Sequence, residues 1–138
     1  METNLNRVFV TLTNDHIDRN GHVSEVGYLT VANFAYWQIC DQVGLLKLYS
    51  QYKISGIVFD THMDFKKEVF EGENVTVNLT FTIKKDVRKI VRLLNIHDRE
   101  NRLVVKIKSN GGFLDLEKRK IVEPPQPILD TCLKYLRG

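Results

Sequence analysis

Apolar and polar residues alternate through most of the second half of the chain. A period of two over five or more residues is typical of β-strands that bury one face. Turn residues separate the alternating segments near residues 71–73, 85–86 and 98–101, and such short connections predict an antiparallel meander. The pattern predicts strands at about residues 8–12, 57–65, 75–83, 88–97 and 103–108.

A long helix is predicted between the first strand and the others. No charged residue occurs between Glu25 and Asp41, and the helix is expected from about Glu25 to Val43. Ser24 suits an N-cap and Gly44 a C-terminal stop. Apolar residues lie around most of its circumference, which predicts a buried helix with a sheet wrapped around it. A short helix is expected near residues 128–136, so the fold class is α+β.

Size and composition indicate one globular domain covering residues 1–138. The net charge of +3 does not suggest nucleic acid but suits an anionic small molecule. The N-terminus lacks a secretory pattern, and no apolar run approaches the ~20 residues of a membrane span. Cys40 and Cys132 form no disulfide framework. We therefore expect a cytoplasmic protein that does not insert into membranes.

The segment from Asp18 to Leu29 carries the candidate chemistry. It places an acid, a turn and a helix start within a dozen residues. The free N–H groups and dipole of a helix N-terminus favour negative charge, so this geometry can polarise a carbonyl and attack it. An aspartate in a loop is also a common turn or cap residue, which is the alternative role for Asp18.

This segment resembles the active-site motif of hotdog-fold acyl-CoA thioesterases, the 4-hydroxybenzoyl-CoA thioesterase group. Their pattern is Asp-x-x-Gly-His-Val-Asn-Asn-x-x-Tyr-Leu. Ser24 and Glu25 stand in place of the two asparagines. The matching residues are Asp18, Gly21, His22, Val23, Tyr28 and Leu29.

The resemblance implies a hotdog fold, an antiparallel sheet wrapped around one long central helix. It implies hydrolysis of an acyl-CoA thioester, with Asp18 as nucleophile or general base and the helix N-terminus as oxyanion site. His22 would orient Asp18 or the substrate, or make only a structural hydrogen bond. Glu25 would face the acyl pocket, or act only on the helix dipole.

The resemblance also implies where the substrate lies. Basic residues at one strand turn would contact coenzyme A phosphates, although such a cluster is often only a solvated edge. The active site of the resembled family lies at a dimer interface, and we expect a homodimer or homotetramer. No cofactor is expected beyond coenzyme A as part of the substrate. The residues assigned to substrate binding are Asn20, Gly21, Val23, Tyr28, Lys84, Lys85, Arg88 and Lys89.

Other functions stay open from the sequence. The Gly-His-Val-x-Glu-x-x-Tyr version of the motif resembles a betainyl-CoA thioesterase branch, in which Trp37 and Tyr28 would hold a cationic acyl group. A hotdog enoyl-CoA hydratase would need Asp-x-Asn-Pro-x-His, and here the proline is missing. A non-catalytic acyl-binding module is the third alternative. The four histidines show no metal-ligand spacing, so no metal is expected.

Overall fold

The structure is a computed structural model that describes residues 5–19 and 21–138. Within these residues one antiparallel sheet has the strand order β1-β3-β4-β5-β2, and β6 pairs with β5. The predicted α+β class is confirmed. The strands are β1 (Arg7–Thr11), β2 (Ile54–Phe65), β3 (Asn74–Ile83), β4 (Lys89–Asp98), β5 (Leu103–Asp115) and β6 (Lys120–Val122). The helices are η1 (Asn14–His16), α1 (Glu25–Gln42), α2 (Leu45–Tyr52) and α3 (Gln126–Tyr135).

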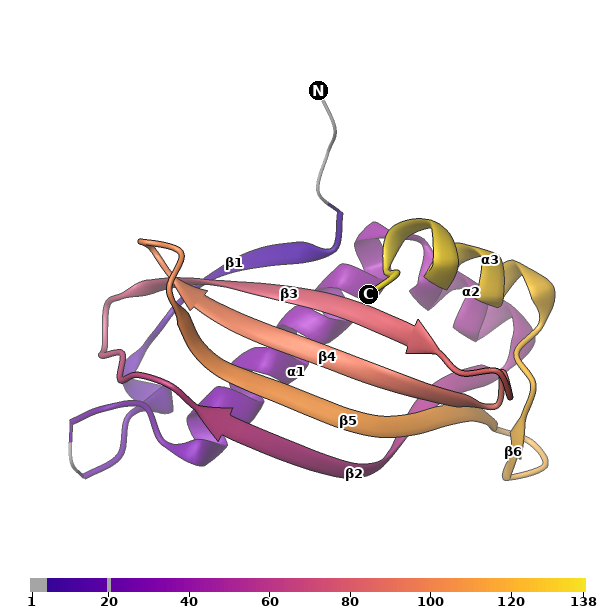
Figure 1. The fold of residues 1–138 in the computed structure, drawn as a ribbon, viewed down its shortest axis with the longest axis horizontal. Helices are drawn as coiled ribbons and strands as arrows, with labels where there is room; N and C mark the ends of the chain where they lie inside the picture. Colours follow the sequence, from indigo (N-terminus) through magenta and orange to yellow (C-terminus); the bar gives the residue numbers. More distant parts are fainter. Residues whose placement is uncertain (1–4, 20) are drawn as a thin grey trace.

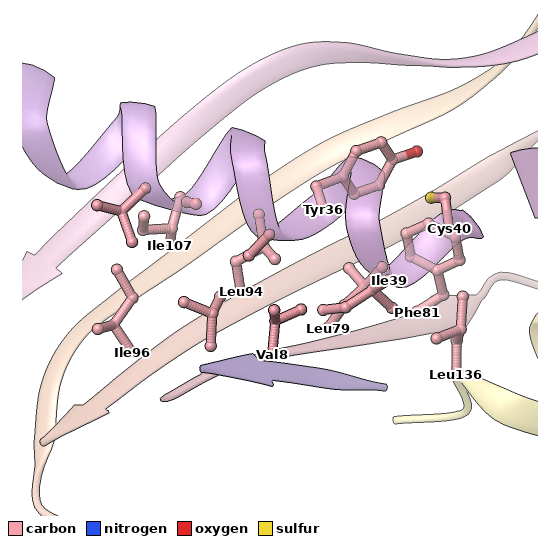
Figure 2. Packing of buried hydrophobic residues seen from close by; sticks show 14 of the residues in the cluster. Val8, Tyr36, Ile39, Cys40, Leu79, Phe81, Leu94, Ile96, Ile107 and Leu136 are labelled. Carbon is pink, nitrogen blue, oxygen red and sulfur yellow. The ribbon is translucent and has the colours of Figure 1, made fainter. Parts of the chain in front are cut away.

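The long helix α1 lies across one face of the sheet (Figure 1). Its bounds match the prediction, since Val43 is the C-cap and Gly44 follows with a φ of 83°, a conformation that favours glycine. Figure 2 shows Ile39 of α1 packed with aliphatic and aromatic side chains of the strands. The buried face of α1 consists of Gly27, Tyr28, Val31, Ala32, Ala35, Tyr36, Ile39 and Cys40.

The opposite face of α1 is exposed in the single chain, so the prediction of a helix buried on all sides is wrong for one chain. Val26, Phe34 and Trp37 are 71%, 58% and 46% exposed in the single chain. The helix is apolar on both faces, but the sheet of one chain covers only one of them. An uncovered apolar face of this size is typical of an interface.

Strand β2 contains a feature that simple alternation did not predict. Its pairing with β5 is irregular between Val58 and Asp60, so Phe59 is an extra residue. A bulge of this kind exchanges the faces beyond it. Val58 therefore shares the inner face with Met63, whereas alternation had grouped Met63 with Ile57 and Phe59. Helix α2 was also not predicted.

The two edges of the sheet differ. On one side β1 covers the first half of β3, and the N–H of Leu79 donates to the carbonyl of Asn6 (2.8 Å). The C-terminal tail covers the second half, where the N–H of Gly138 donates to the carbonyl of Phe81 (3.0 Å). On the other side, no strand among the described residues pairs with the free edge of β2.

Candidate active site

The loop before α1 is a small hairpin that fixes the backbone of Asp18. The N–H of Asp18 donates to the carbonyl of His22 (3.1 Å), and the N–H of Gly21 donates to the carbonyl of Asp18 (3.1 Å). Gly21 has a φ of 81°, which explains the glycine at this turn. Ile17 and Val23 form a bridge at the base. Asn20, predicted to bind substrate, lies outside the described residues.

The N-terminus of α1 packs closely against the segment that precedes this hairpin. The N–H of Ser24 donates to the carbonyl of His16 (3.1 Å). A Cβ on Gly27 would lie 2.3 Å from the same carbonyl oxygen, so only glycine fits. The sequence motif therefore carries a packing requirement at Gly27 that was not among the predicted site residues.

Ser24 caps only part of the helix. Its Oγ accepts from the N–H of Gly27 (2.9 Å), which satisfies one of the first-turn donors. The first backbone N–H that donates to a carbonyl of this helix is that of Tyr28, to Ser24 (2.9 Å), so helix geometry gives the N–H groups of Glu25 and Val26 no partner within α1. Capping by Ser24 is therefore compatible with two donors left for a ligand at this end of the helix.

A cavity of about 620 Å³ opens at this point. Its volume falls within the range of small-molecule sites. The hairpin, the first turn of α1 and the segment after β2 form its walls. The lining residues are Asp18, His22, Val23, Ser24, Glu25, Val26, Tyr28, Phe65, Lys66, Lys67 and Glu68. The cavity thus brings together five predicted site residues that the structure describes, Asp18, His22, Val23, Glu25 and Tyr28, with a wall that we had not assigned to the site.

His22 and Glu25 differ in their surroundings. The Nε2 atom of His22 lies 3.8 Å from Oε1 of Glu68, and its Nδ1 lies 3.4 Å from the carbonyl oxygen of Val23. These contacts match the structural alternative for His22, and its role in orienting Asp18 stays a prediction. Glu25 is exposed in the first turn and lines the cavity, so it can meet both the helix dipole and a substrate.

Tyr28 forms part of the apolar wall. Its ring is buried and lies 5.7 Å from that of Phe65, measured between centroids. Burial raises the pKa of the Tyr28 hydroxyl above its usual value, the negative charges of Glu68 and Glu73 raise it further, and a hydrogen bond with the backbone of Val69 opposes them. The hydroxyl therefore stays protonated near neutral pH and can donate a hydrogen bond.

The segment Lys66–Val69, which we call the strap, forms the wall that sequence reasoning missed. The N–H of Val23 donates to the carbonyl of Val69 (3.3 Å), so the strap is bonded to the hairpin. Lys67 Nζ lies 2.6 Å from Oδ2 of Asp98, whose side chain is only 3% exposed. The Lys67 ammonium holds the pKa of Asp98 well below its usual range, aided by N–H donors of Arg102 and Glu100.

The strap directly follows β2 in the chain, but it lies outside the segment from Asp18 to Leu29 that carried the resemblance. Only the pairing of Val23 with Val69 in the folded chain shows that the two segments face one cavity.

The basic turn between β3 and β4 does not join this cavity within one chain. β3 has ten residues, about 33 Å at 3.3 Å per residue, and it runs from the Asp18 end of the sheet to this turn (Figure 1). Arg88 is paired with Asp86 through Nε (3.0 Å) and Nη2 (3.2 Å). Lys84, Lys85 and Lys89 instead line a second cavity of about 460 Å³, together with Phe59 and Asn110.

Two features are absent among the described residues, a metal site and a membrane-spanning helix. No group of three or more His, Cys, Asp or Glu side chains is arranged to hold a metal ion there. Nor does that part of the chain contain a helix with the length and apolar character needed to cross a membrane.

The fold and the cavity define a class of protein. An antiparallel sheet around one long helix, with an acid-bearing hairpin at the N-terminus of that helix, is the hotdog arrangement of thioesterases. The family model of the thioesterase-like superfamily matches residues 11–131. The chain belongs to this superfamily, as its motif predicted. No curated protein sequence matches it significantly.

Solved structures with the same fold cover nearly the whole chain. A 1,4-dihydroxy-2-naphthoyl-CoA thioesterase from Synechocystis has a TM-score of 0.78 at 19% identity, covering 92% of this chain and 94% of its own. The YbaW probable thioesterase from Escherichia coli has a TM-score of 0.81 at 14% identity, covering 96% and 98%. A Staphylococcus aureus protein in complex with CoA has a TM-score of 0.77 at 16% identity, covering 94% and 82%. The predicted hotdog fold is confirmed.

Proposed function

We propose that this protein hydrolyses acyl-CoA thioesters to a carboxylic acid and free coenzyme A. One observation carries the proposal: the carboxylate-bearing hairpin of Asp18 and the first turn of α1 line the same cavity. A thioester needs a nucleophile or base on one side of its carbonyl carbon and hydrogen-bond donors at its oxygen. Membership in the thioesterase-like superfamily supports this choice among the chemistries that the site could perform.

In the proposed mechanism the thioester oxygen lies at the N–H groups of Glu25 and Val26. These donors stabilise the negative charge that develops on the oxygen as the carbonyl is attacked. Asp18 either attacks the carbonyl carbon itself or removes a proton from a water molecule that attacks it. If Asp18 attacks, it displaces coenzyme A as the thiolate and forms a mixed anhydride, which water hydrolyses to the carboxylic acid and the Asp18 carboxylate, and the released proton goes to the thiolate. If water attacks, the protonated Asp18 returns its proton to the departing sulfur. In both routes coenzyme A leaves as the thiol. The protonated Tyr28 and the ring of Phe65 border the acyl group.

We further propose that the active unit is a homodimer formed through the free edge of β2. Two antiparallel copies of β2 that overlap fully would place Phe65 of one chain beside Ile54 of the other. This brings the Asp18 cavity of one subunit toward the end of the sheet that carries the basic turn of its partner. Lys84, Lys85 and Lys89 could then meet the phosphates of coenzyme A, which they cannot do within one chain.

The substitution Asp18→Asn tests the proposed chemistry. The amide keeps the size of the side chain but loses the charge, so thiol release should fall roughly 10²–10⁴-fold, the usual contribution of a general base. KM should change much less, because the lysines that would hold coenzyme A are unaltered. The matched control is Asp15→Asn, an exposed aspartate on η1 that does not line the cavity. Turnover by Asp18→Asn within about threefold of the parent would refute this mechanism.

A further inference from the structure

A group of buried hydrogen-bond donors lies under α1, outside the Asp18 cavity. Arg92 is on the inner face of β4, and its guanidinium carbon lies 4.8 Å from the centroid of the Tyr36 ring. Nε of Arg92 is buried without a hydrogen-bond partner, and the hydroxyl of Tyr49 is buried beside that of Tyr36, with which it interacts. No carboxylate lies within ion-pair distance of Arg92 among the described residues. We call Arg92, Tyr36, Tyr49 and Ser109 the donor cluster.

Three members of the donor cluster, Tyr36, Arg92 and Ser109, line a small cavity beside β2. The cavity measures about 10 Å³, which is close to the room of one water-sized atom, and Tyr36, Arg92, Ser109 and Gly56 are among its walls. A Cβ on Gly56 would lie 2.9 Å from the Tyr36 hydroxyl and 3.4 Å from that of Tyr49. The bare glycine therefore lets both hydroxyls approach the backbone of the edge strand.

The donor cluster offers hydrogen-bond donors but contains no negatively charged acceptor. Burial is the main cause that raises the pKa values of the Tyr36 and Tyr49 hydroxyls, so both remain protonated donors. The Ser109 hydroxyl shares a hydrogen bond with that of Thr61 (2.9 Å). A buried donor without a partner, such as Nε of Arg92, is costly. A ligand oxygen with negative charge is the group that would satisfy these donors.

We propose that the donor cluster receives the far end of the acyl group, and that the enzyme prefers acyl-CoA substrates whose distal end carries a carboxylate. This inference rests on the proposed hydrolysis and on pairing through β2. In that pairing the Phe65 end of β2, which walls the Asp18 cavity, meets the Ile54–Val58 end of the partner, which walls the donor cluster. The acyl group held at one subunit would point toward the cluster of the other.

Hydrolysis of two matched substrate series tests the inference. The first series runs from succinyl-CoA to suberyl-CoA, and the second from butyryl-CoA to octanoyl-CoA, so that each pair differs only at the distal carboxylate. At the best chain length the wild type should favour the carboxylate about tenfold or more in kcat/KM, as expected for a charge-assisted hydrogen bond. Arg92→Met should lose this preference and still hydrolyse the plain acyl-CoA, and Arg92→Lys should restore part of it.

Arg7→Met is the matched control, because Arg7 also stacks on an aromatic ring, that of Phe9, but on the exposed strand β1. It should leave the preference unchanged. If the wild type hydrolyses the plain series as well as the carboxylate series at every length, the inference is overturned while the proposed function stands. If no thioester is hydrolysed, the proposed function fails, and the anion site is tested separately by the melting temperature with free suberate. Suberate should raise the melting temperature of the wild type but not that of Arg92→Met. If suberate does not raise the melting temperature of the wild type, the anion site is overturned.

Discussion

At the scale of single residues, Gly27 determines how closely the Asp18 hairpin and α1 approach each other. The carbonyl of His16 accepts from Ser24 and occupies the space where a Cβ of residue 27 would be. The same contact fixes where the first-turn N–H groups point relative to Asp18. A helix normally gains from replacing glycine with alanine, and this position should be an exception.

We expect Gly27→Ala to destabilise the protein despite the gain of about 1 kcal/mol in helix propensity. The added methyl group would lie too close to the carbonyl oxygen of His16. Because that oxygen belongs to the backbone, the hairpin must shift, at a typical overpacking cost of about 1–3 kcal/mol. Thiol release should also fall, because the donors move relative to Asp18. Urea denaturation measures the free energy of unfolding. The control Asn33→Ala, at an exposed position of α1, should be neutral or slightly stabilising. If the two variants had the same free energy of unfolding, the hairpin would be able to move away from the added methyl group without cost, and this prediction would be wrong.

At the scale of elements, the strap, which forms one wall of the cavity, is held by the buried carboxylate of Asp98, which does not itself line the cavity. Asp98 ends β4 and binds Lys67 of the strap, Arg102 and two backbone N–H groups of the following turn. One residue therefore ties the β4–β5 turn to the wall of the cavity. The free energy that this contact supplies must depend on the ionisation of Asp98.

We expect Asp98→Asn to lower the free energy of unfolding in a pH-dependent way. The folded-state pKa of Asp98 is lowered, so its contribution is complete above the unfolded value of about 3.9 and is lost as pH falls through the lower folded value. The difference between wild type and variant should be largest near pH 6 and shrink below about pH 4. Asp64→Asn is the control, because its partner Lys66 is also exposed and such pairs contribute little. A difference that stays constant with pH would contradict this account.

Sequence patterns predicted elements better than they predicted contacts between elements. The cap at Ser24, the glycine at position 44 and the charge-free stretch between them were enough to locate α1. The bulge at Phe59 was missed because Ile57, Val58 and Phe59 are consecutive apolar residues, so alternation gives no sign that one of them is extra. Helix α2 was missed because it is short and follows α1 with only two intervening residues, Val43 and Gly44.

In the candidate site, too, the sequence predicted what lies close together in the chain and missed contacts between distant segments. Local spacing grouped the hairpin with the start of α1, because these residues are neighbours in the chain. The strap and the donor cluster depend on the pairing of Val23 with Val69 and of Arg92 with Ser109, which only the folded sheet specifies. The distance between the lysine turn and Asp18 likewise follows from strand length and not from composition.

At the scale of the whole molecule, the single chain leaves an apolar surface that its own sheet does not cover. On α1 this surface includes Phe34 and Trp37, and on the edge strand β2 it includes Val58 and Phe65. A free strand edge next to apolar side chains is a surface that folded proteins normally cover. A second copy paired through β2 would cover both parts at once.

We therefore expect a dimer at micromolar concentration, and Phe34→Glu should convert it to monomer. Phe34 is 58% exposed in one chain, so the substitution should change the fold of the monomer little, whereas a glutamate buried at the interface would lack a partner for its charge. Sedimentation velocity measures the mass, and circular dichroism checks that the fold is kept. The matched control is Phe9→Glu, since Phe9 is 71% exposed on β1, at the opposite edge of the sheet. If the site needs the partner's lysines, Phe34→Glu should also raise KM for acyl-CoA. The control Phe9→Glu should stay a dimer and keep the wild-type KM. A wild type that sediments as a monomer would rule out the β2 dimer and, with it, the route from Asp18 to the donor cluster of a partner.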